Sequence, residues 1–150
     1  MPSFSFTAIP SIKANNFVPS FLLISSSLSV RRPASGQITS FLDRFFYASK
    51  GFAYKPGAAI VSCRRGGSTA AFEQLNKYFT ISNMPVVSSQ YWNMVHGTTP
   101  DEVKQDLEGM QTMRTLGKNM AWLLKSIQAG IDAGIKLPEK EQRVGTNFIR

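Results

Sequence analysis

The first 42 residues contain no acidic side chain, and the whole chain of 150 residues contains one cysteine, Cys63, and one histidine, His96. A lone thiol excludes an intramolecular disulfide, and it excludes a zinc site that needs several thiolates. With a single histidine as well, the sequence predicts no transition-metal site built from protein ligands alone. Scarce cysteine is typical of proteins in a reducing compartment, so we expect the protein to be cytoplasmic.

Long hydrophobic runs and clusters of positive charge are also absent. No apolar run approaches the roughly 18 residues of a membrane span, and the longest apolar patch, Phe21–Ile24, ends at three serines. The net charge is +8, but beyond residue 42 it arises from 14 basic and 9 acidic side chains with no run of four Lys or Arg. The sequence therefore predicts neither a membrane protein nor a nucleic-acid-binding protein. A hydrophobic share of 43% is sufficient for one domain with one core.

The chain divides into two unequal parts at about residue 35. Residues 1–35 are rich in Ser, Pro, Phe and Ile, and they show no helical or strand periodicity. A Ser-rich, acid-free start is typical of an organelle transit peptide, although Pro10, Pro19 and Pro33 would interrupt its amphipathic helix. The alternative is a mistranslated or truncated start that is joined to a genuine domain, and we favour this second interpretation. The segment is then disordered or non-native in origin.

Residues 36–150 show regular helix and strand signals. Residues 36–47 predict a helix, because they place apolar side chains at helical spacing. These side chains are Ile38, Phe41, Leu42, Phe45 and Phe46, and we expect the phenylalanines to be core residues. Residues 58–63 form a continuous apolar run, which is typical of a strand buried on both faces. Residues 64–67 predict a turn.

Further elements follow the turn. Ser68 or Thr69 caps a second predicted helix, with Phe72, Leu75, Asn76 and Phe79 along one side. Residues 84–89 predict another short buried strand. Thr99 begins a third helix, because a capping hydroxyl, Pro100 and two acidic residues follow one another there. An apolar stripe from Val103 to Ile131 extends this helix over about eight turns. From Pro138 on, the tail is polar and is expected to be extended.

This order of elements predicts an α/β fold, in which a parallel sheet carries helices on both faces in three layers. Two strands alone do not form a stable sheet of this kind. Either Phe17–Leu28 supplies a third strand, or the domain requires a partner.

The segment with the most chemical content is Ser62-Cys63-Arg64-Arg65-Gly66-Gly67-Ser68, between the first buried strand and the helix that follows. Ligands of α/β folds bind at the carboxyl ends of such strands. The glycines allow a close backbone approach to a flat or anionic ligand, and successive N–H groups before a helix attract oxyanions. The arginines add planar donors and charge. The plainer interpretation is a β–α turn with two solvated arginines.

Three stretches together carry a resemblance to a known family. They are SGQITSFLDRFFYAS, KPGAAIVSCRRGGSTAAFEQLNKYF and NMPVVSSQYWNMVHG. In this order they resemble the NAD(P)H-dependent FMN reductase and iron–sulfur flavoprotein branch of the flavodoxin-like superfamily, over about residues 36–150. The resemblance implies a flavodoxin-like domain that is incomplete at its N-terminus. It also implies FMN as cofactor, NAD(P)H as electron donor, an unknown electron acceptor and a homo-oligomer.

The resemblance assigns roles to particular residues. Ser62, Cys63, Arg64, Arg65, Gly66, Gly67 and Ser68 match the family loop beside the isoalloxazine ring, and their backbone N–H groups would bond its carbonyl edge. Arg64 or Arg65 would add charge there or receive the phosphates of the nicotinamide nucleotide. Tyr91, Trp92 and His96 would contact a flavin or a neighbouring subunit. The plainer interpretation is that Tyr91 and Trp92 cover the core or an interface and that His96 is solvated or locally bonded. Cys63 is expected to be a packing residue rather than a redox thiol. No catalytic side chain is implied, since the cofactor supplies the chemistry.

The sequence also departs from the family pattern. The first strand with its Ser/Thr-rich phosphate loop is missing, as is the cysteine cluster of some relatives. Residues 27–35 replace the Gly-Ser-Pro-Val-Tyr-type loop expected before Gly36. The predicted function is an FMN-dependent oxidoreductase that transfers hydride from NAD(P)H to the flavin and passes electrons on to an unknown acceptor. Without the phosphate loop, this chain is then a truncated, inactive form. The alternative is a non-catalytic, oligomerising interaction protein derived from a flavodoxin fold.

Overall fold

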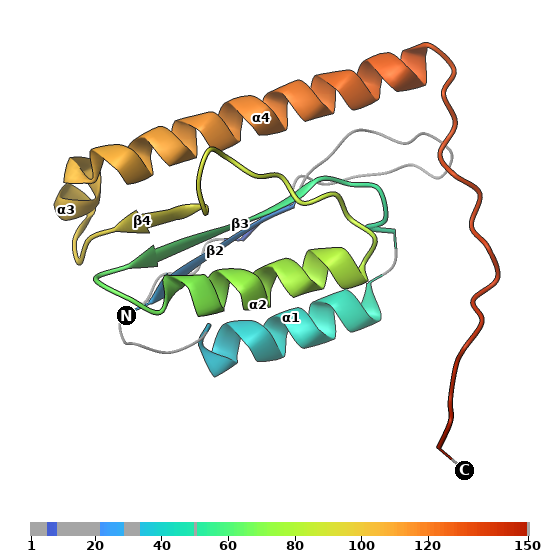
Figure 1. Ribbon diagram of the computed structural model, residues 1–150, viewed down its shortest axis with the longest axis horizontal. Coiled ribbons are helices and arrows are strands. Elements are labelled where there is room, and N and C mark those ends of the chain that lie inside the picture. Colours follow the sequence, from blue (N-terminus) through green and yellow to red (C-terminus); the bar gives the residue numbers. More distant parts are fainter. Residues whose placement is uncertain (1–5, 9–21, 29–33, 50, 150) are drawn as a thin grey trace.

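The computed structural model describes residues 6–8, 22–28, 34–49 and 51–149 (Figure 1). Within them the chain forms four strands and four helices in an α/β arrangement. The elements are β1 (Phe6–Ala8), β2 (Leu22–Leu28), α1 (Gly36–Ala48), β3 (Gly57–Cys63), α2 (Ser68–Ile81), β4 (Met94–His96), α3 (Pro100–Gln105) and α4 (Leu107–Asp132).

The strands form one sheet in the order β1-β2-β3-β4. Strand β2 runs parallel to β3 over its whole length, from Leu22 opposite Gly57 to Leu28 opposite Cys63. Strand β4 is also parallel to β3, whereas β1 is antiparallel to β2. The expectation that a segment ending at Leu28 supplies a third strand is confirmed for β2, while residues 17–21 lie outside the described residues. The wider interpretation of residues 1–35 stays a prediction.

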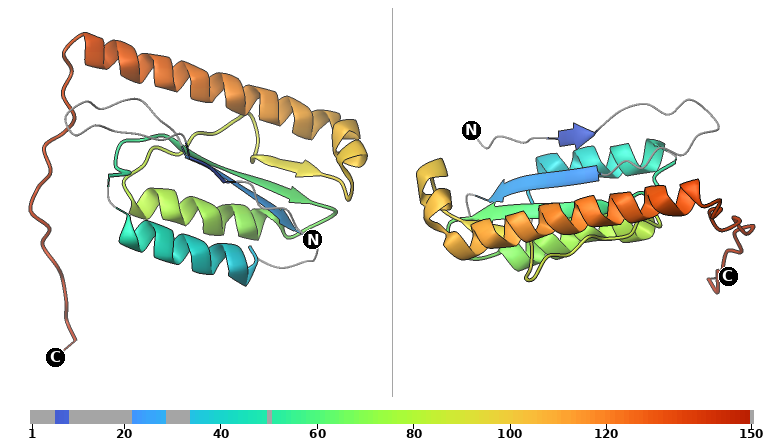
Figure 2. Two further views of the ribbon diagram at one scale, coloured as in Figure 1. Left: turned by 180° about the vertical axis from the view of Figure 1, so that it is seen from behind. Right: turned by 90° about the horizontal axis from the view of Figure 1, so that it is seen from above.

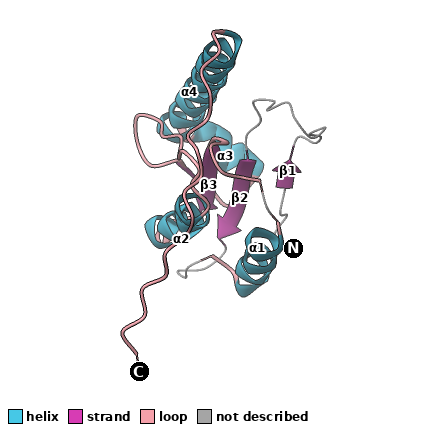
Figure 3. Cartoon of the chain, turned by 90° about the vertical axis from the view of Figure 1, so that its right-hand side faces the viewer, coloured by secondary structure: helices cyan, strands magenta, loops and turns pink. Residues whose placement is uncertain are grey.

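Helices cover both faces of the sheet, as the continuous apolar run of β3 predicts. Helices α1 and α2 lie side by side on one face and α4 lies on the other (Figures 2 and 3). Along β3, Ala59, Val61 and Cys63 belong to the core beneath α1 and α2, whereas Ala58 and Ile60 contact α4. This alternation is the period of two expected for a central strand.

The aromatic residues of α1 are only partly core residues. Phe45 and Phe46 are half-buried against the core that includes Leu42 and Phe79. Phe41 stacks on Phe45 with ring centroids 5.7 Å apart, but its side chain is 48% exposed. The expectation that Phe41 is a core residue is therefore wrong, because it lies on the outer flank of the helix.

The predicted strand at residues 84–89 is also wrong. The segment makes a single parallel bridge at Val86, through hydrogen bonds from Gly57 N–H to Pro85 O at 2.8 Å and from Val87 N–H to Gly57 O at 2.8 Å. The chain then leaves β3 and returns only at Asn93, whose carbonyl accepts from Val61 N–H at 3.0 Å. The true strand is β4. Residues 88–92 form a loop between the two points of contact, which we call the aromatic loop because it contains Tyr91 and Trp92.

The long third helix that the apolar stripe predicts is broken at Asp106, with φ −74° and ψ 81°. Its predicted start is confirmed, since Thr99 Oγ1 accepts a hydrogen bond from Glu102 N–H and Pro100 lies in the first turn. The Asp106 side chain caps α4 by accepting from Gly109 N–H at 2.9 Å. The stripe continues across this break, so periodicity alone does not reveal it.

The tail after α4 is extended and exposed, as predicted from Pro138 on. Gly134, with φ 83°, ends the helix, and its N–H donates to Ile131 O at 2.9 Å. From there the tail runs away from α4 and past the sheet (Figure 1). Among the helices in the described ranges, none combines the length and the hydropathy needed to cross a bilayer.

Candidate functional site

The predicted ligand-binding turn lies at the carboxyl edge of the parallel strands. The register places the ends of β2, β3 and β4 together, with Leu28 beside Cys63 and Cys63 beside His96. The turn of residues 64–67 leaves this edge and leads directly into α2. Gly67 adopts φ 90°, a left-handed conformation that glycine accepts without a steric penalty. A parallel sheet commonly binds its ligand at such an edge.

The seven residues of the predicted site have different surroundings. Arg64, Arg65 and Gly66 are exposed, Ser62 and Gly67 are half-buried, and Cys63 and Ser68 are buried. Cys63 is 1% exposed and packs in the core under α1 and α2, which agrees with a packing role.

The backbone of the turn is open. In the described part of the chain, no acceptor is recorded for the N–H groups of residues 64–67. A methyl group built on Gly66 would meet no atom within 4 Å. Amides that donate to no acceptor among the described residues are available to a ligand, and the N-terminus of α2 behind them adds a positive potential.

The charge of Arg64 acts on Glu102, in the first turn of α3. The pKa of Glu102 is lowered first by the hydrogen bond that Thr98 N–H donates at 2.6 Å, and the charge of Arg64 contributes to the same shift. The Arg64 guanidinium thus lies close enough to α3 to influence its first turn. Both charged groups are exposed, so the effect is a surface one.

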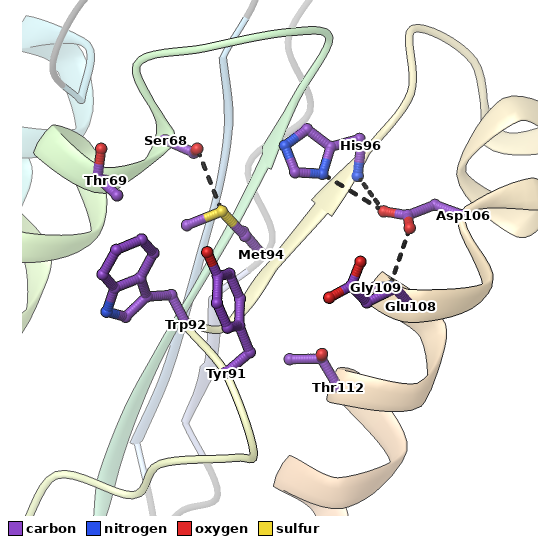
Figure 4. A pocket seen from close by; sticks show the side chains of 10 residues that line it. All are labelled: Ser68, Thr69, Tyr91, Trp92, Met94, His96, Asp106, Glu108, Gly109 and Thr112. Atoms are coloured by element: carbon purple, nitrogen blue, oxygen red, sulfur yellow. Dashed lines mark hydrogen bonds and ion pairs between the residues drawn. The ribbon is translucent and has the colours of Figure 1, made fainter.

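A cleft of about 320 Å³ lies beside the turn (Figure 4). Ser68, Tyr91 and Trp92 are on one side, and His96, Asp106 and Glu108 are on the other. Of the seven predicted site residues, Ser68 is the one that lines the cleft. Its hydroxyl donates to the sulfur of Met94 at 3.3 Å. The turn and the cleft are therefore neighbouring surfaces that meet at the start of α2.

The aromatic loop is anchored to α4. Asn119 Nδ2 donates to Ser88 O at 2.8 Å, and Thr115 Oγ1 donates to the side chain of Gln90 at 3.0 Å. These bonds leave Tyr91 and Trp92 at the mouth of the cleft, 53% and 51% exposed, with ring centroids 5.0 Å apart. Exposed aromatic rings held by a fixed loop offer a stacking surface for a planar ligand.

Asp106 holds the opposite side of the cleft. Its Oδ2 accepts from the backbone N–H of His96 at 2.7 Å and lies 3.5 Å from His96 Nδ1. Burial alone would raise the pKa of Asp106, but the hydrogen bonds from Gly109 and His96 outweigh it and lower the pKa. A carboxylate at this point therefore stays ionised at neutral pH.

Sequence reasoning named some of these residues and missed others. Tyr91, Trp92 and His96 were assigned to a flavin, a neighbouring subunit or the core, and the structure places all three at the cleft. The sequence does not single out Asp106 and Glu108, because the apolar stripe predicts one continuous helix across both positions. The available signal was Asp106 with Gly109 three residues later, a pattern that suits a new helix start.

Comparison with known proteins identifies the segment that contains the turn. Residues 32–99 match the family described as NADPH-dependent FMN reductase. This segment is therefore similar to the FMN reductase family. An iron–sulfur flavoprotein of Methanocaldococcus jannaschii is 31% identical over an alignment of 103 residues. The alignment covers 63% of this chain and 53% of the relative. The chain thus spans about half the length of that curated relative.

The FMN reductase segment includes the turn and the aromatic loop, and it ends before α3. It therefore contains Ser68, Tyr91, Trp92 and His96 of the cleft, whereas Asp106 and Glu108 lie beyond it. An FMN reductase binds a tricyclic ring with a carbonyl edge, and the open amides of residues 64–67 fit such an edge. An iron–sulfur centre does not fit this chain, because these centres need several cysteine thiolates and the chain has Cys63 alone.

Proposed function

We propose that the protein is an FMN-dependent oxidoreductase that takes hydride from NAD(P)H and passes electrons to a further acceptor. The observation that carries the proposal is the open backbone of residues 64–67 at the carboxyl edge of the sheet, inside the segment that matches the FMN reductase family. FMN would supply the redox chemistry, so the chain needs no nucleophile of its own.

The turn would bind the carbonyl edge of the flavin ring. Each hydrogen bond from an amide contributes about 0.5–1.5 kcal/mol to a neutral carbonyl and about 1.5–3 kcal/mol to a charged acceptor. Such bonds strengthen as negative charge develops on the ring, so they favour its reduced form. Arg65 is exposed beside these amides and adds positive charge, either to the ring edge or to a nucleotide phosphate.

The phosphate of FMN is expected to be held weakly. Residues 27–35 replace the loop that the family resemblance places before α1, and residues 29–33 lie outside the described residues. We therefore propose that this chain acts as a truncated form with reduced affinity for FMN. A cytoplasmic location and a homo-oligomer complete the proposal, the first from the scarcity of cysteine.

The test is to titrate the purified chain with FMN and follow the absorbance and fluorescence of the flavin. NADH or NADPH is then added with an artificial electron acceptor, and the consumption of each donor is measured. Binding of FMN with donor consumption by either nucleotide is the expected result. A folded chain that leaves FMN free at saturating concentrations contradicts the proposal.

A matched pair of variants locates the flavin. In Gly66→Ala the new methyl group meets no protein atom within 4 Å, so it occupies only the space where a ligand would approach. Gly117→Ala is equally open but lies on α4. We expect Gly66→Ala to weaken FMN binding about tenfold, equivalent to about 1.4 kcal/mol, and Gly117→Ala to leave it unchanged. Equal affinities for both variants would place the flavin elsewhere.

A second candidate function is a non-catalytic interaction protein that oligomerises. It is favoured by an apolar groove of about 370 Å³ between β3 and α4, lined by Ile60, Leu116, Met120 and neighbouring apolar groups. Exposed apolar residues in the tail, such as Val144 and Phe148, favour it too. Light scattering tests this candidate, because a strict monomer contradicts it. The oxidoreductase proposal would then lose its homo-oligomer and keep its chemistry.

A further inference from the structure

The two sides of the cleft beside the turn have different chemistry. Tyr91 and Trp92 form one side and present their rings to the opening (Figure 4). The carboxylates of Asp106 and Glu108 lie across from them, and the Glu108 carboxylate points toward the aromatic pair. None of the described residues that line the cleft is a lysine or an arginine. The cleft is therefore both aromatic and negatively charged.

These features together select a class of ligand. A planar aromatic ring stacks on exposed aromatic side chains, and a positive charge on that ring is attracted by the π faces and by nearby carboxylates. Asp106 supports this, because its hydrogen bonds keep it ionised. An anionic ring would be repelled by the same carboxylates.

We propose that this cleft binds the nicotinamide ring of the electron donor and stabilises the positive charge that the ring acquires on oxidation. The inference rests on the proposed function for the identity of the donor. In the reaction, the C4–H bond of the dihydronicotinamide breaks and its hydrogen leaves with both electrons as hydride. The donor is oxidised to a cationic ring, the flavin is reduced by the two electrons, and solvent supplies the further proton.

The turn and the cleft carry charges opposite to those that develop on the two rings during hydride transfer. The amides of residues 64–67 lie where negative charge develops, and Asp106 and Glu108 lie where positive charge develops. Groups that stabilise developing charge more than the starting state lower the barrier. Ser68, the residue that follows the turn, lines the cleft, so ligands bound at the turn and in the cleft would lie on neighbouring surfaces. Hydride transfer requires reacting atoms about 3–3.5 Å apart.

The same reasoning excludes the flavin ring as the preferred occupant of the cleft. A reduced flavin is more anionic than an oxidised one, so the carboxylate pair would oppose its formation there. The turn offers donors instead of carboxylates and suits that ring better. This assignment differs from one in which Tyr91 and Trp92 contact the flavin directly.

The test uses 1-methylnicotinamide, a cation, and neutral nicotinamide as probes, without FMN. The chain has two tryptophans, Trp92 at the cleft and Trp122 on α4. In Trp122→Phe the remaining fluorescence reports on Trp92, and in Trp92→Phe it reports on Trp122. We expect saturable quenching of Trp92 by the cation, with weaker binding of the neutral probe, and no saturation at Trp122.

Glu108→Gln in the Trp122→Phe background tests the charge. Removing an exposed carboxylate should weaken binding of the cation about threefold to fivefold and leave the neutral probe unaffected. Glu139→Gln, in the exposed tail, should change neither. If Glu108→Gln fails to fold, the comparison of the two probes on the parent chain still decides, because equal affinities overturn the proposal.

Competition with FMN distinguishes the ligands. If FMN displaces the cation from Trp92, the cleft belongs to the flavin and the proposal is overturned. If FMN binds and leaves the quenching in place, the two sites are separate, as proposed. A chain that binds the cation but not FMN counts against the proposed function alone, and a chain that binds FMN but not the cation counts against this inference alone.

Discussion

Asp106 contacts both the backbone and the side chain of His96 at the end of β4. The backbone N–H of His96 donates to Asp106 Oδ2 at 2.7 Å, and the imidazole Nδ1 lies 3.5 Å from the same oxygen. The other carboxylate oxygen accepts from Gly109 N–H at 2.9 Å. One side chain thus caps α4 and joins its start to the end of β4, at one side of the cleft.

Replacement of Asp106 should destabilise the protein in a pH-dependent way. Asp106→Ala removes a helix cap and leaves the His96 N–H without its acceptor, and we expect a loss of about 2 kcal/mol at neutral pH. The folded pKa of Asp106 is lowered from 3.8, so its contribution is fully present above that value and is lost as pH falls through the folded pKa. The difference between parent and variant should therefore narrow below about pH 4.

Urea unfolding at neutral pH and at about pH 3 measures this difference. Asp101→Asn is the matched control, because Asp101 is an exposed carboxylate that pairs with Lys104 three residues away. It should change the free energy of unfolding by less than about 0.5 kcal/mol. A constant gap between parent and Asp106→Ala at both pH values would show that the carboxylate charge contributes nothing.

Replacement by alanine should have opposite effects on stability at two glycines of α4. A methyl group on Gly109 would clash with the Asp106 side chain and would lie 3.1 Å from the Cα of Val95. Asp106 cannot move aside without breaking its hydrogen bonds, so we expect Gly109→Ala to destabilise by about 1–3 kcal/mol. Gly117 has open space around it, and Gly117→Ala should stabilise by about 0.5–1 kcal/mol through helix propensity. If the unfolding temperatures of both variants shift in the same direction, this packing is contradicted.

The sequence predicts the elements better than it predicts the site. Residues 58–63 are apolar except for Ser62, which favours a strand buried on both faces, and Thr99 has the features of a helix start. The strand after α2 is misplaced because two apolar segments, at Val86 and at Met94, both contact β3. Periodicity cannot decide which of them pairs for longer, since tertiary hydrogen bonding makes that choice.

The cleft was only partly predictable for a related reason. The glycine turn is a local signal, and the exposed aromatics stand out by composition. Glu108 and Asp106 join them through the break between α3 and α4, which the apolar stripe conceals. A site assembled from segments separated along the chain depends on such breaks, and residue spacing does not encode them.

Tyr78 should ionise at an unusually high pH. Burial, followed by the hydrogen bond to Asp43 Oδ1 at 2.6 Å, raises the pKa of Tyr78 to about 12. Because folding favours the neutral phenol, the stability that Tyr78 contributes is complete below pH 10.0 and declines as the pH rises toward 12. A titration followed by the Cζ chemical shifts of the tyrosines measures this directly.

Asp43→Asn should bring the pKa of Tyr78 down toward 10.0, since it removes the carboxylate that opposes ionisation. Tyr78→Phe should delete the late-titrating signal, and Tyr47→Phe, at an exposed position of α1, should leave it in place. A late signal that survives Tyr78→Phe would assign the effect to another tyrosine.

The aromatic loop should become less ordered when its hydrogen bond to Asn119 of α4 is removed. Asn119→Ala removes the hydrogen bond to Ser88 O, and because that bond is exposed the free energy of unfolding should fall by no more than about 1 kcal/mol. The loop then relies on the Thr115 bond to Gln90. In the Trp122→Phe background, we expect lower fluorescence anisotropy of Trp92 and about threefold weaker binding of 1-methylnicotinamide.

Lys118→Ala controls for changes in α4 that do not involve the loop, because Lys118 is exposed and adjacent to Asn119 in the chain. It should leave both the anisotropy and the affinity unchanged. Matching losses in the two variants would mean that α4 supports the loop through its general packing. A loss confined to Asn119→Ala would establish that a single side-chain amide presents Trp92 to the cleft, since binding to a preorganised aromatic surface avoids the entropy of ordering it.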